Sequence, residues 1–464
     1  MGLTLSSLFI IPYGIFCFFR SSDLLIKSAI FFVPFSATSV INLGSGVPIT
    51  AFQYLALILI FKQILQVFFS GKFFWPSEKI QSYSLKLCFL FLLLCFFSLI
   101  TPALIDGEYY IYSTDFSKGY PLVKLSFSLS NINKLFPLFI GIFLIFILLQ
   151  NSTSVKSLRS YLRIYVISIC FISSWGLIQY FLWILGIEYP DFIFNTMISE
   201  LRVEDSEISS ESGVVRRIYS VTQEPSHFVC FLLSGLPILY VNNFFGEPII
   251  KRFFGTLFIF IIIFTLLISF TTTGVGGLAI FSLITYLTLY ARNPISLIFR
   301  SLFFLTIMIL LIISLSQFEV VGNFLNLIFI EKLISGSMIE RIFFIEKAWF
   351  HFLDYPFLGL GMGNITSSDL IIFLLSNIGI IGFLLFLYLI RSLVKGATVN
   401  KKILLNNTDY FNRSTNLALI DGVLIAFYVQ LSIYLLMGFV WYLPVFYLMI
   451  FFIISVSSKN LSIN

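Results

Sequence analysis

The 464-residue chain has little charge and very little histidine. Charged residues make up 11% of the sequence, there are two histidines, and 59% of the residues are hydrophobic. A soluble globular domain carries about 25% charged residues, so this composition excludes a soluble protein. The basic residues are scattered over short segments between apolar runs, and they indicate no nucleic-acid partner.

The five cysteines show neither a metal-ligand spacing nor the pattern of a disulfide framework. All of them lie in apolar stretches, and we interpret them as buried small hydrophobic residues. The sequence therefore predicts no metal site and indicates no cofactor. The N-terminus lacks the basic segment and the small-residue cleavage site of a signal peptide, so we expect a retained span there.

Long apolar runs recur along the whole chain. They predict an all-α polytopic integral membrane protein, a single membrane domain over residues 1–464, with about 13 (12–14) transmembrane helices. The weak alternating segments of about 10 residues that mark an outer-membrane barrel are missing. The predicted spans are 3–19, 24–42, 49–69, 84–104, 135–150, 160–186, 227–244, 253–270, 274–291, 299–317, 369–391, 417–436 and 440–457.

The connectors between these spans differ in charge, and the difference predicts the topology. Six basic connectors fall on one side when the spans are counted off alternately, and the positive-inside rule places that side in the cytoplasm. It then carries 19 of the 28 basic and 5 of the 22 acidic residues, whereas the other side carries 9 and 17. The six are Arg20–Lys27, Lys72–Lys86, Lys156–Arg163, Lys251–Arg252, Arg292–Arg300 and Arg391–Arg413.

Two large loops face outward in this topology, 187–226 and 318–368. The first holds eight acidic residues and three arginines, and the second predicts an amphipathic helix that lies at the membrane surface. Loops of this length between membrane helices are usually functional or disordered. Arginines placed outside, against the general distribution of basic residues, predict a site for an anionic ligand carried by a lipid. They are Arg202, Arg216, Arg217 and Arg341.

The segment from Arg216 to His227 leads directly into a predicted span. Arg216 and Arg217 present planar guanidinium groups that fit phosphate oxygens. Glu224 and His227 are three residues apart, so they share a face of the first helical turn, where either can accept a proton from a sugar hydroxyl. The alternative that Glu224-Pro225-Ser226 is simply a helix start stays open.

Two further elements contribute candidates. Thr272 and Thr273 open a helix on the outer side, where free backbone N–H groups can bind an anion. A tight hairpin packed through glycines is the alternative. Arg341 and His351 precede a stretch of glycines around Pro356 that ends the helix, and a solvated surface arginine is the alternative reading of Arg341.

The order of these elements resembles the superfamily of O-antigen polymerases and O-antigen ligases. The matching pieces cover most of the chain: Arg217 with Glu224-Pro225-Ser226, the Thr273-Gly274 hairpin, Arg341 ahead of Pro356–Asn364, and Asn377–Gly382 in the next span. Ligases of that superfamily carry a His-Asn pair where this chain has Ser368-Asp369, and this departure favours a polymerase.

The resemblance implies a glycosyltransferase of the bacterial inner membrane whose active site faces the periplasm. It transfers O-antigen or capsule glycan from undecaprenyl diphosphate to the non-reducing end of another lipid-linked repeat unit. Arg217, Arg341 and Glu224 are its predicted catalytic residues. The predicted diphosphate- and glycan-binding residues are Arg216, His227, Thr272, Thr273 and His351.

Other readings of the chain remain open. An O-antigen ligase uses the same lipid-linked donor and transfers finished glycan to lipid A core. A flippase or other transporter is a different class, for which paired repeats or broken helices at mid-membrane are typical. A chain-length regulator protein is left open as a further partner.

Overall fold

Helices make up most of the fold, and the strands are short. The computed structural model describes residues 2–43, 47–71, 75–105, 107–112, 121–127, 129–152, 154–197, 207–210, 213–289, 336–406, 410–438 and 442–458. Its helices are α1 (Ser7–Arg20), α2 (Ser22–Phe31), α3 (Ala51–Ser70), α4 (Lys79–Ser98), α5 (Ile100–Ile105), α6 (Leu129–Asn151), α7 (Val155–Ile184), α9 (Pro225–Phe245), α10 (Arg252–Ile268), α11 (Thr272–Leu289), α14 (Gly336–Asp354), α15 (Leu370–Leu405), α16 (Tyr410–Met437) and α17 (Val445–Val456).

Three small antiparallel sheets connect some of these helices. One contains β1 (Gly2–Leu3), β2 (Ser39–Leu43) and β3 (Val47–Thr50), and the other two are hairpins. The hairpins are β4 (Tyr110–Tyr112) with β5 (Leu122–Lys124), and β6 (Glu207–Ser210) with β7 (Gly213–Arg216). The hairpin β6–β7 falls within the predicted outward-facing loop 187–226, and β4–β5 falls within the connector 105–134, which the alternation of the predicted spans also places outside.

The chain is a helical multi-pass membrane protein. Eight of the described helices are long and apolar enough to cross a membrane, and three more, α1, α10 and α17, are apolar but shorter. Each of these helices matches a predicted span. The predicted span 299–317, with the first part of the loop 318–368, lies outside the described residues.

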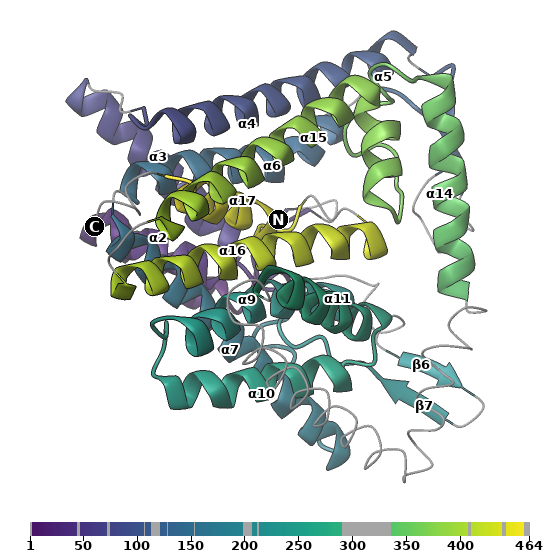
Figure 1. The fold of residues 1–464 in the computed structure, drawn as a ribbon. Coiled ribbons are helices and arrows are strands. Elements are labelled where there is room, and N and C mark those ends of the chain that lie inside the picture. The colour runs from purple at the N-terminus through teal and green to yellow at the C-terminus, as the bar shows by residue number, and fades with distance from the viewer. Residues whose placement is uncertain are drawn as a thin grey trace.

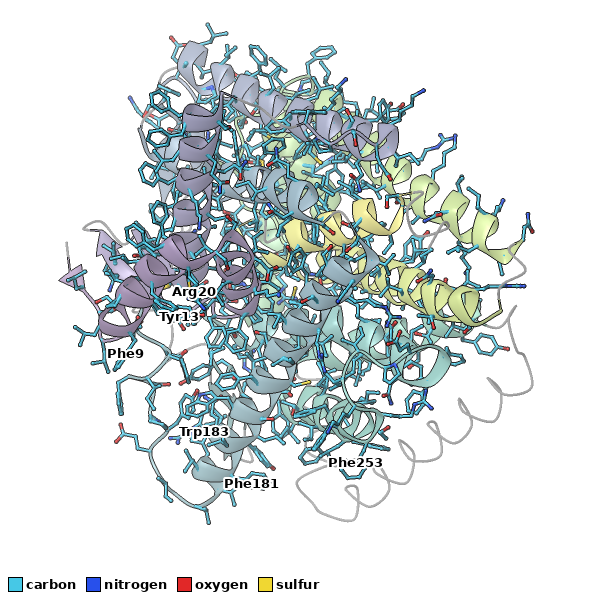
Figure 2. All side chains as sticks on the ribbon, turned by 90° about the vertical axis from the view of Figure 1, so that its left-hand side faces the viewer. Phe9, Tyr13, Arg20, Phe181, Trp183 and Phe253 are labelled. Atoms are coloured by element: carbon cyan, nitrogen blue, oxygen red, sulfur yellow. The ribbon has the colours of Figure 1, made fainter. Side chains whose placement is uncertain are left out.

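One apolar core runs through the bundle, and lipid-compatible side chains cover its outside. Helices α9 and α16 pack along each other in the middle, and nearly all side chains of α9 are buried (Figure 1). Phe9, Phe181 and Phe253 lie at the periphery, where at least half of each side chain is exposed (Figure 2). Exposed phenylalanine side chains on the outside of the bundle suit contact with hydrocarbon rather than with water.

The predicted span 24–42 is wrong as a single helix. Helix α2 ends at Phe31, and the chain continues through a turn into strand β2. Pro34 explains the end, because a proline disfavours the helical conformation of the residue before it and lacks a backbone N–H. The apolar residues after it are buried against the protein as a strand and turn, so hydrophobicity alone misled the prediction.

Helix α15 is broken near its start. Gly379 has φ +66° and ψ −175°, a conformation that glycine alone adopts readily. The chain before the helix packs into the break: the N–H of Ile380 donates to the carbonyl of Pro356 at 2.8 Å, and that of Leu360 donates to the carbonyl of Ser376 at 2.9 Å. The backbone groups that the break frees thereby find partners inside the protein, as a low-dielectric environment requires.

Asn377 completes this arrangement. Its side chain accepts from the N–H of Ile365 at 3.0 Å and donates to the carbonyl of the same residue at 2.8 Å. The side-chain amide therefore bonds to both backbone groups of Ile365, as a paired β-strand would, and holds the segment 356–365 against α15. The sequence prediction that the glycines around Pro356 end the helix is consistent with the end of α14 at Asp354.

Helix α14 lies across the ends of the long helices rather than beside them (Figure 1). Phe344 and Ala348 face inward and are buried, whereas Ile342, Trp349 and Leu353 on the other face are exposed. An amphipathic helix in this orientation suits a position at the membrane surface. That position remains a prediction, and the structure supplies the amphipathic helix on which it depends.

Candidate functional site

The segment that follows Arg217 enters the protein and is buried. Ile218, Ser220 and Val221 are fully shielded from solvent. The side-chain oxygen of Gln179, in α7, accepts from the backbone N–H groups of Tyr219 at 3.2 Å and Ser220 at 2.8 Å. The loop 187–226, which the sequence predicts to face outward, is thus held by hydrogen bonds to the membrane helix α7.

Polar groups of the preceding loop hold the same segment from the other side. The carbonyl of Ser220 accepts from the hydroxyl of Tyr189 and from the amide of Asn195, both at 2.9 Å. The hydroxyl of Tyr219 donates to the carboxylate of Asp191 at 2.9 Å. These bonds leave the backbone from 218 to 222 little freedom to move, because each would have to break for the segment to shift.

Arg217 lies where the hairpin β6–β7 passes into this buried segment. Strand β7 ends at Arg216, which is exposed, and Arg217 is partly buried. Since the residues after it are held by hydrogen bonds, the backbone position of Arg217 is ordered before any ligand binds. A phosphate-binding arginine benefits from this, because less entropy is lost on binding when its backbone is already ordered.

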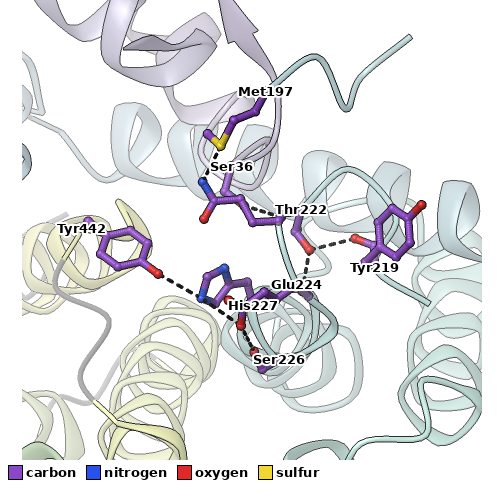
Figure 3. A network of polar contacts seen from close by, with 9 residues as sticks. Ser36, Met197, Tyr219, Thr222, Glu224, Ser226, His227 and Tyr442 are labelled. Atoms are coloured by element: carbon purple, nitrogen blue, oxygen red, sulfur yellow. Dashed lines mark hydrogen bonds and ion pairs between the residues drawn. The ribbon is translucent and has the colours of Figure 1, made fainter. Parts of the chain in front are cut away.

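Glu224, His227 and Tyr442 form a polar group at the start of α9 (Figure 3). The helix begins as predicted: Glu224 is the N-cap residue and Pro225 the first helical residue. A carboxylate oxygen of Glu224 lies 3.9 Å from His227 Nε2, and the hydroxyl of Tyr442 lies 3.4 Å from the same nitrogen. Glu224 also accepts from the hydroxyl of Ser226 at 3.0 Å.

The side chains of Glu224 and His227 differ in how far they are exposed to solvent. About half of the Glu224 side chain is exposed (48%), whereas His227 is buried at 3%. Nδ1 of His227 has no hydrogen-bond partner among the described residues. Glu224 and Tyr442, whose side chain is also exposed, are therefore the members that can meet a substrate, whereas His227 is buried. Tyr442 was missed by the sequence analysis, for which an aromatic residue near a span end was the only signal.

A cavity of about 190 Å³ adjoins this group. Ser36, Met197, Gln223 and Tyr442 are among its lining residues. The backbone N–H of Gln223 donates to the Ser36 hydroxyl at 3.3 Å, so the wall is held together between loops far apart in sequence. The volume is below the roughly 300–1,000 Å³ of typical ligand pockets, so the cavity accommodates only part of a large substrate.

The residues at the start of α11 favour the hairpin alternative. The hydroxyl oxygen of Thr271 accepts from the N–H of Gly274 at 3.0 Å, which occupies one of the free N–H groups that an anion would need. Thr273 is buried, Thr272 is partly buried, and a side chain at Gly277 would collide with Leu233 of α9. Anion binding by Thr272 and Thr273 stays a prediction.

His351 belongs to a second polar group, on α14. The hydroxyl of Tyr109 lies 2.8 Å from His351 Nδ1 and donates to the carboxylate of Asp354 at 2.6 Å. Burial and this bond to Asp354 raise the pKa of Tyr109, so the phenol keeps its proton. Since the phenol proton is donated in the hydrogen bond to Asp354, the phenol oxygen accepts from Nδ1–H of His351, which leaves Nε2 with a lone pair.

Arg341 lies on the same helix, ten residues before His351, and is partly buried. Within the described ranges, no hydrogen bond or ion pair joins it to Glu224 or His227. The structure therefore assembles two polar groups. Of the predicted residues, Glu224 and His227 belong to the first and His351 to the second. A substrate that bridges them would have to supply the connection.

Lys134 adds a cation that the sequence analysis did not single out. It lies in the first turns of α6, and its ammonium donates to the side-chain oxygen of Asn364 at 3.1 Å. Asn131 donates to the same oxygen at 2.6 Å. No acidic partner of Lys134 occurs in the part of the chain that the structure describes. A partly buried cation beside the segment 356–365 attracts anions.

We expect the stability of the protein to depend on pH through His351. Burial lowers its pKa below the ordinary 6.5, and the nearby Lys347 acts in the same direction while Asp354 opposes it. Between the lowered value and 6.5 the unfolded chain binds a proton that the folded chain does not. Stability should therefore be constant above about pH 6.5 and fall as the pH drops toward the lowered pKa.

Thermal unfolding midpoints between pH 7.5 and pH 5 measure this effect. The wild-type midpoint should fall further in acid than that of His351→Gln, which has no titrating ring. Lys347→Ala should reduce the loss in acid, because Lys347 helps to lower the pKa of His351. Parallel curves for the wild type and His351→Gln would show that His351 does not titrate in this way.

Comparison with known proteins identifies no family for the chain. No protein-family model matches it, and no curated protein matches it.

Proposed function

We propose that the protein is a polysaccharide polymerase of the bacterial inner membrane, with its active site on the periplasmic side. The observation that carries the proposal is the immobilised segment 217–227, which presents a partly buried arginine and a half-exposed carboxylate at one end of the membrane helices. These are the groups that a diphosphate leaving group and an acceptor hydroxyl require.

The proposed reaction joins two lipid-linked glycans. A hydroxyl of the acceptor's non-reducing sugar attacks C1 of the donor glycan, and the bond between C1 and the phosphate oxygen breaks. Undecaprenyl diphosphate leaves with the electron pair, and the hydroxyl proton passes to the carboxylate of Glu224. Arg217 and Arg341 bind the diphosphate and stabilise the charge that develops on it. Arg216 assists from the exposed end of β7.

The remaining predicted residues bind substrate in this scheme. The lone pair on His351 Nε2 accepts a hydrogen bond from a sugar hydroxyl, and His227 supports Glu224 from behind. The threonines at the start of α11 contact the glycan. Lys134 brings a further positive charge to the outer side.

The break in α15 bears on the transporter alternative. Broken helices at mid-membrane serve transporters because their free backbone groups bind the substrate. Here the segment 356–365 occupies those groups, as the bond from Ile380 N–H to the Pro356 carbonyl illustrates. The break therefore has a packing role in this chain, which favours an enzyme over a transporter.

Deletion of the gene in its own host tests the proposal. We expect a gel of the surface polysaccharide to lose its ladder and to keep glycolipid with a single repeat unit. Bare lipid A core with long chains left on the polyprenyl carrier would instead identify a ligase. Bare core with single lipid-linked units on the cytoplasmic face would identify a flippase, and an unchanged ladder would exclude all three.

A further inference from the structure

A pocket lined by basic residues lies at the opposite end of α9 from Glu224. It has a volume of about 680 Å³ and is formed by the start of α7, the turn between α9 and α10, and α16. Helix α9 has 21 residues, so its two ends are about 30 Å apart, the thickness of a bilayer's hydrocarbon core. The pocket and the candidate site therefore belong to opposite membrane faces.

The charge of this pocket is strongly unbalanced. Among the described residues that line it are four cations, Lys156, Arg159, Arg163 and Lys251, and one carboxylate, Glu247. Arg159 forms an ion pair with Glu247. In the described part of the chain the other three cations have no acidic partner, so the pocket keeps a net positive charge that an anion can neutralise.

Arg159 also carries an unused donor. Its Nη1 bonds to Glu247, whereas its Nη2 is buried and has no hydrogen-bond partner among the described residues. A buried guanidinium nitrogen without an acceptor costs free energy, because it has lost its hydrogen bonds to water and gained none from the protein. Phosphate oxygens match the geometry of the guanidinium groups that line the pocket, those of Arg159 and Arg163.

The rest of the lining suits a lipid. Val155, Ile249 and Ile250 contribute apolar surface beside the cations. The cations come from connectors that the sequence predicts to be cytoplasmic, where the leaflet is rich in anionic lipid and basic pockets between helices bind phosphate headgroups. A free phosphate ion would use the cations but not the apolar wall.

We propose that this pocket binds the phosphate group of an anionic phospholipid of the cytoplasmic leaflet. The proposal is independent of the polymerase function, because it concerns the other membrane face and shares no residue with the candidate site.

The test uses the full-length protein purified in a neutral detergent, with the thermal midpoint as the readout. Phosphatidylglycerol added to the micelles should raise the midpoint in a saturable way, as binding to the folded state does, and phosphatidylcholine should not. Lys156→Ala with Arg163→Ala should weaken the apparent affinity at least about tenfold. That pair leaves the ion pair between Arg159 and Glu247 intact.

Matched controls separate a site from general attraction. Lys395→Ala with Lys402→Ala removes two exposed cations of α15 from the same predicted face, and should change the affinity less than about twofold. Glu247→Gln should tighten binding, because it removes the carboxylate found among the described residues of the lining. Asp23→Asn removes a carboxylate from the exposed ion pair with Lys27 on the same predicted face, and it should leave the affinity unchanged.

Three results would overturn the proposal. An equal loss of lipid affinity in the pocket double variant and in the Lys395→Ala, Lys402→Ala control would mean that the cations act only through general charge. Equal gains in Glu247→Gln and Asp23→Asn would mean the same. A rise in the midpoint with inorganic phosphate alone, abolished by the Lys156 and Arg163 substitutions, would assign the pocket to a soluble phosphate instead of a lipid.

Discussion

Arg217→Ala should abolish long glycan chains while the protein remains in the membrane. Its guanidinium is the proposed ligand of the diphosphate, and loss of one such preorganised donor lowers a catalytic rate by roughly 100- to 1,000-fold. The backbone of the segment after Arg217 is held by hydrogen bonds from Gln179 and Asn195, which the substitution leaves in place. The substitution should therefore spare folding. Arg341→Ala should act in the same direction.

Neighbouring substitutions sharpen this prediction. Arg217→Lys keeps the charge but loses the planar fork, so it should recover only part of the activity. Arg216→Ala removes an exposed arginine one residue away and should lower the activity less than about tenfold. The length of lipid-linked glycan on a gel, normalised to membrane-inserted protein, measures all four variants. If Arg217→Ala and Arg341→Ala, alone and together, leave chain length intact, the site is assigned wrongly.

Gly379→Ala should destabilise the protein severely. A Cβ at this position would lie 2.1 Å from the carbonyl oxygen of Phe357, and the backbone conformation there is one that L-residues avoid. Neither the helix nor the segment 356–365 can move away without breaking the bonds between them. Conformational strain and the collision together should lower the free energy of unfolding by at least about 3 kcal/mol.

Gly276→Ala is the control for that substitution. Gly276 lies in the regular part of α11, and a Cβ there would meet only Leu436 at 3.9 Å. It should be neutral or stabilising by up to about 1 kcal/mol, because alanine favours helices over glycine. Thermal unfolding in detergent and the yield of membrane-inserted protein compare the two variants. A similar midpoint for both would contradict the role assigned to the break.

Local signals predicted the features that local chemistry decides. The start of α9 follows from Glu224 and Pro225, since a negative charge and a proline both favour the N-terminus of a helix. The amphipathic α14 follows from the spacing of residues such as Ile342 and Trp349. In both cases the pattern lies within a few residues of what it predicts.

Long-range packing decided what the sequence could not show. Tyr109 meets His351 across 242 residues, and Gln179 holds Ser220 across 41 residues. These bonds join side chains to loops that have no periodic pattern, so no local signal reveals them. The end of α2 was missed for a related reason: its apolar continuation is buried by the protein instead of by lipid.

The broken helix also constrains how the protein is made. The long arm beyond Gly379 is apolar only as far as Ile390, after which Arg391, Lys395 and two further lysines follow. Its apolar part is therefore about 16 Å long, and the short arm 370–378 is about 14 Å long, at about 1.5 Å per residue. Neither arm alone matches a hydrocarbon core of about 30 Å. We therefore expect the translocation machinery to insert both arms together as one span, and the segment 356–365, synthesised ahead of them, to close onto the break afterwards.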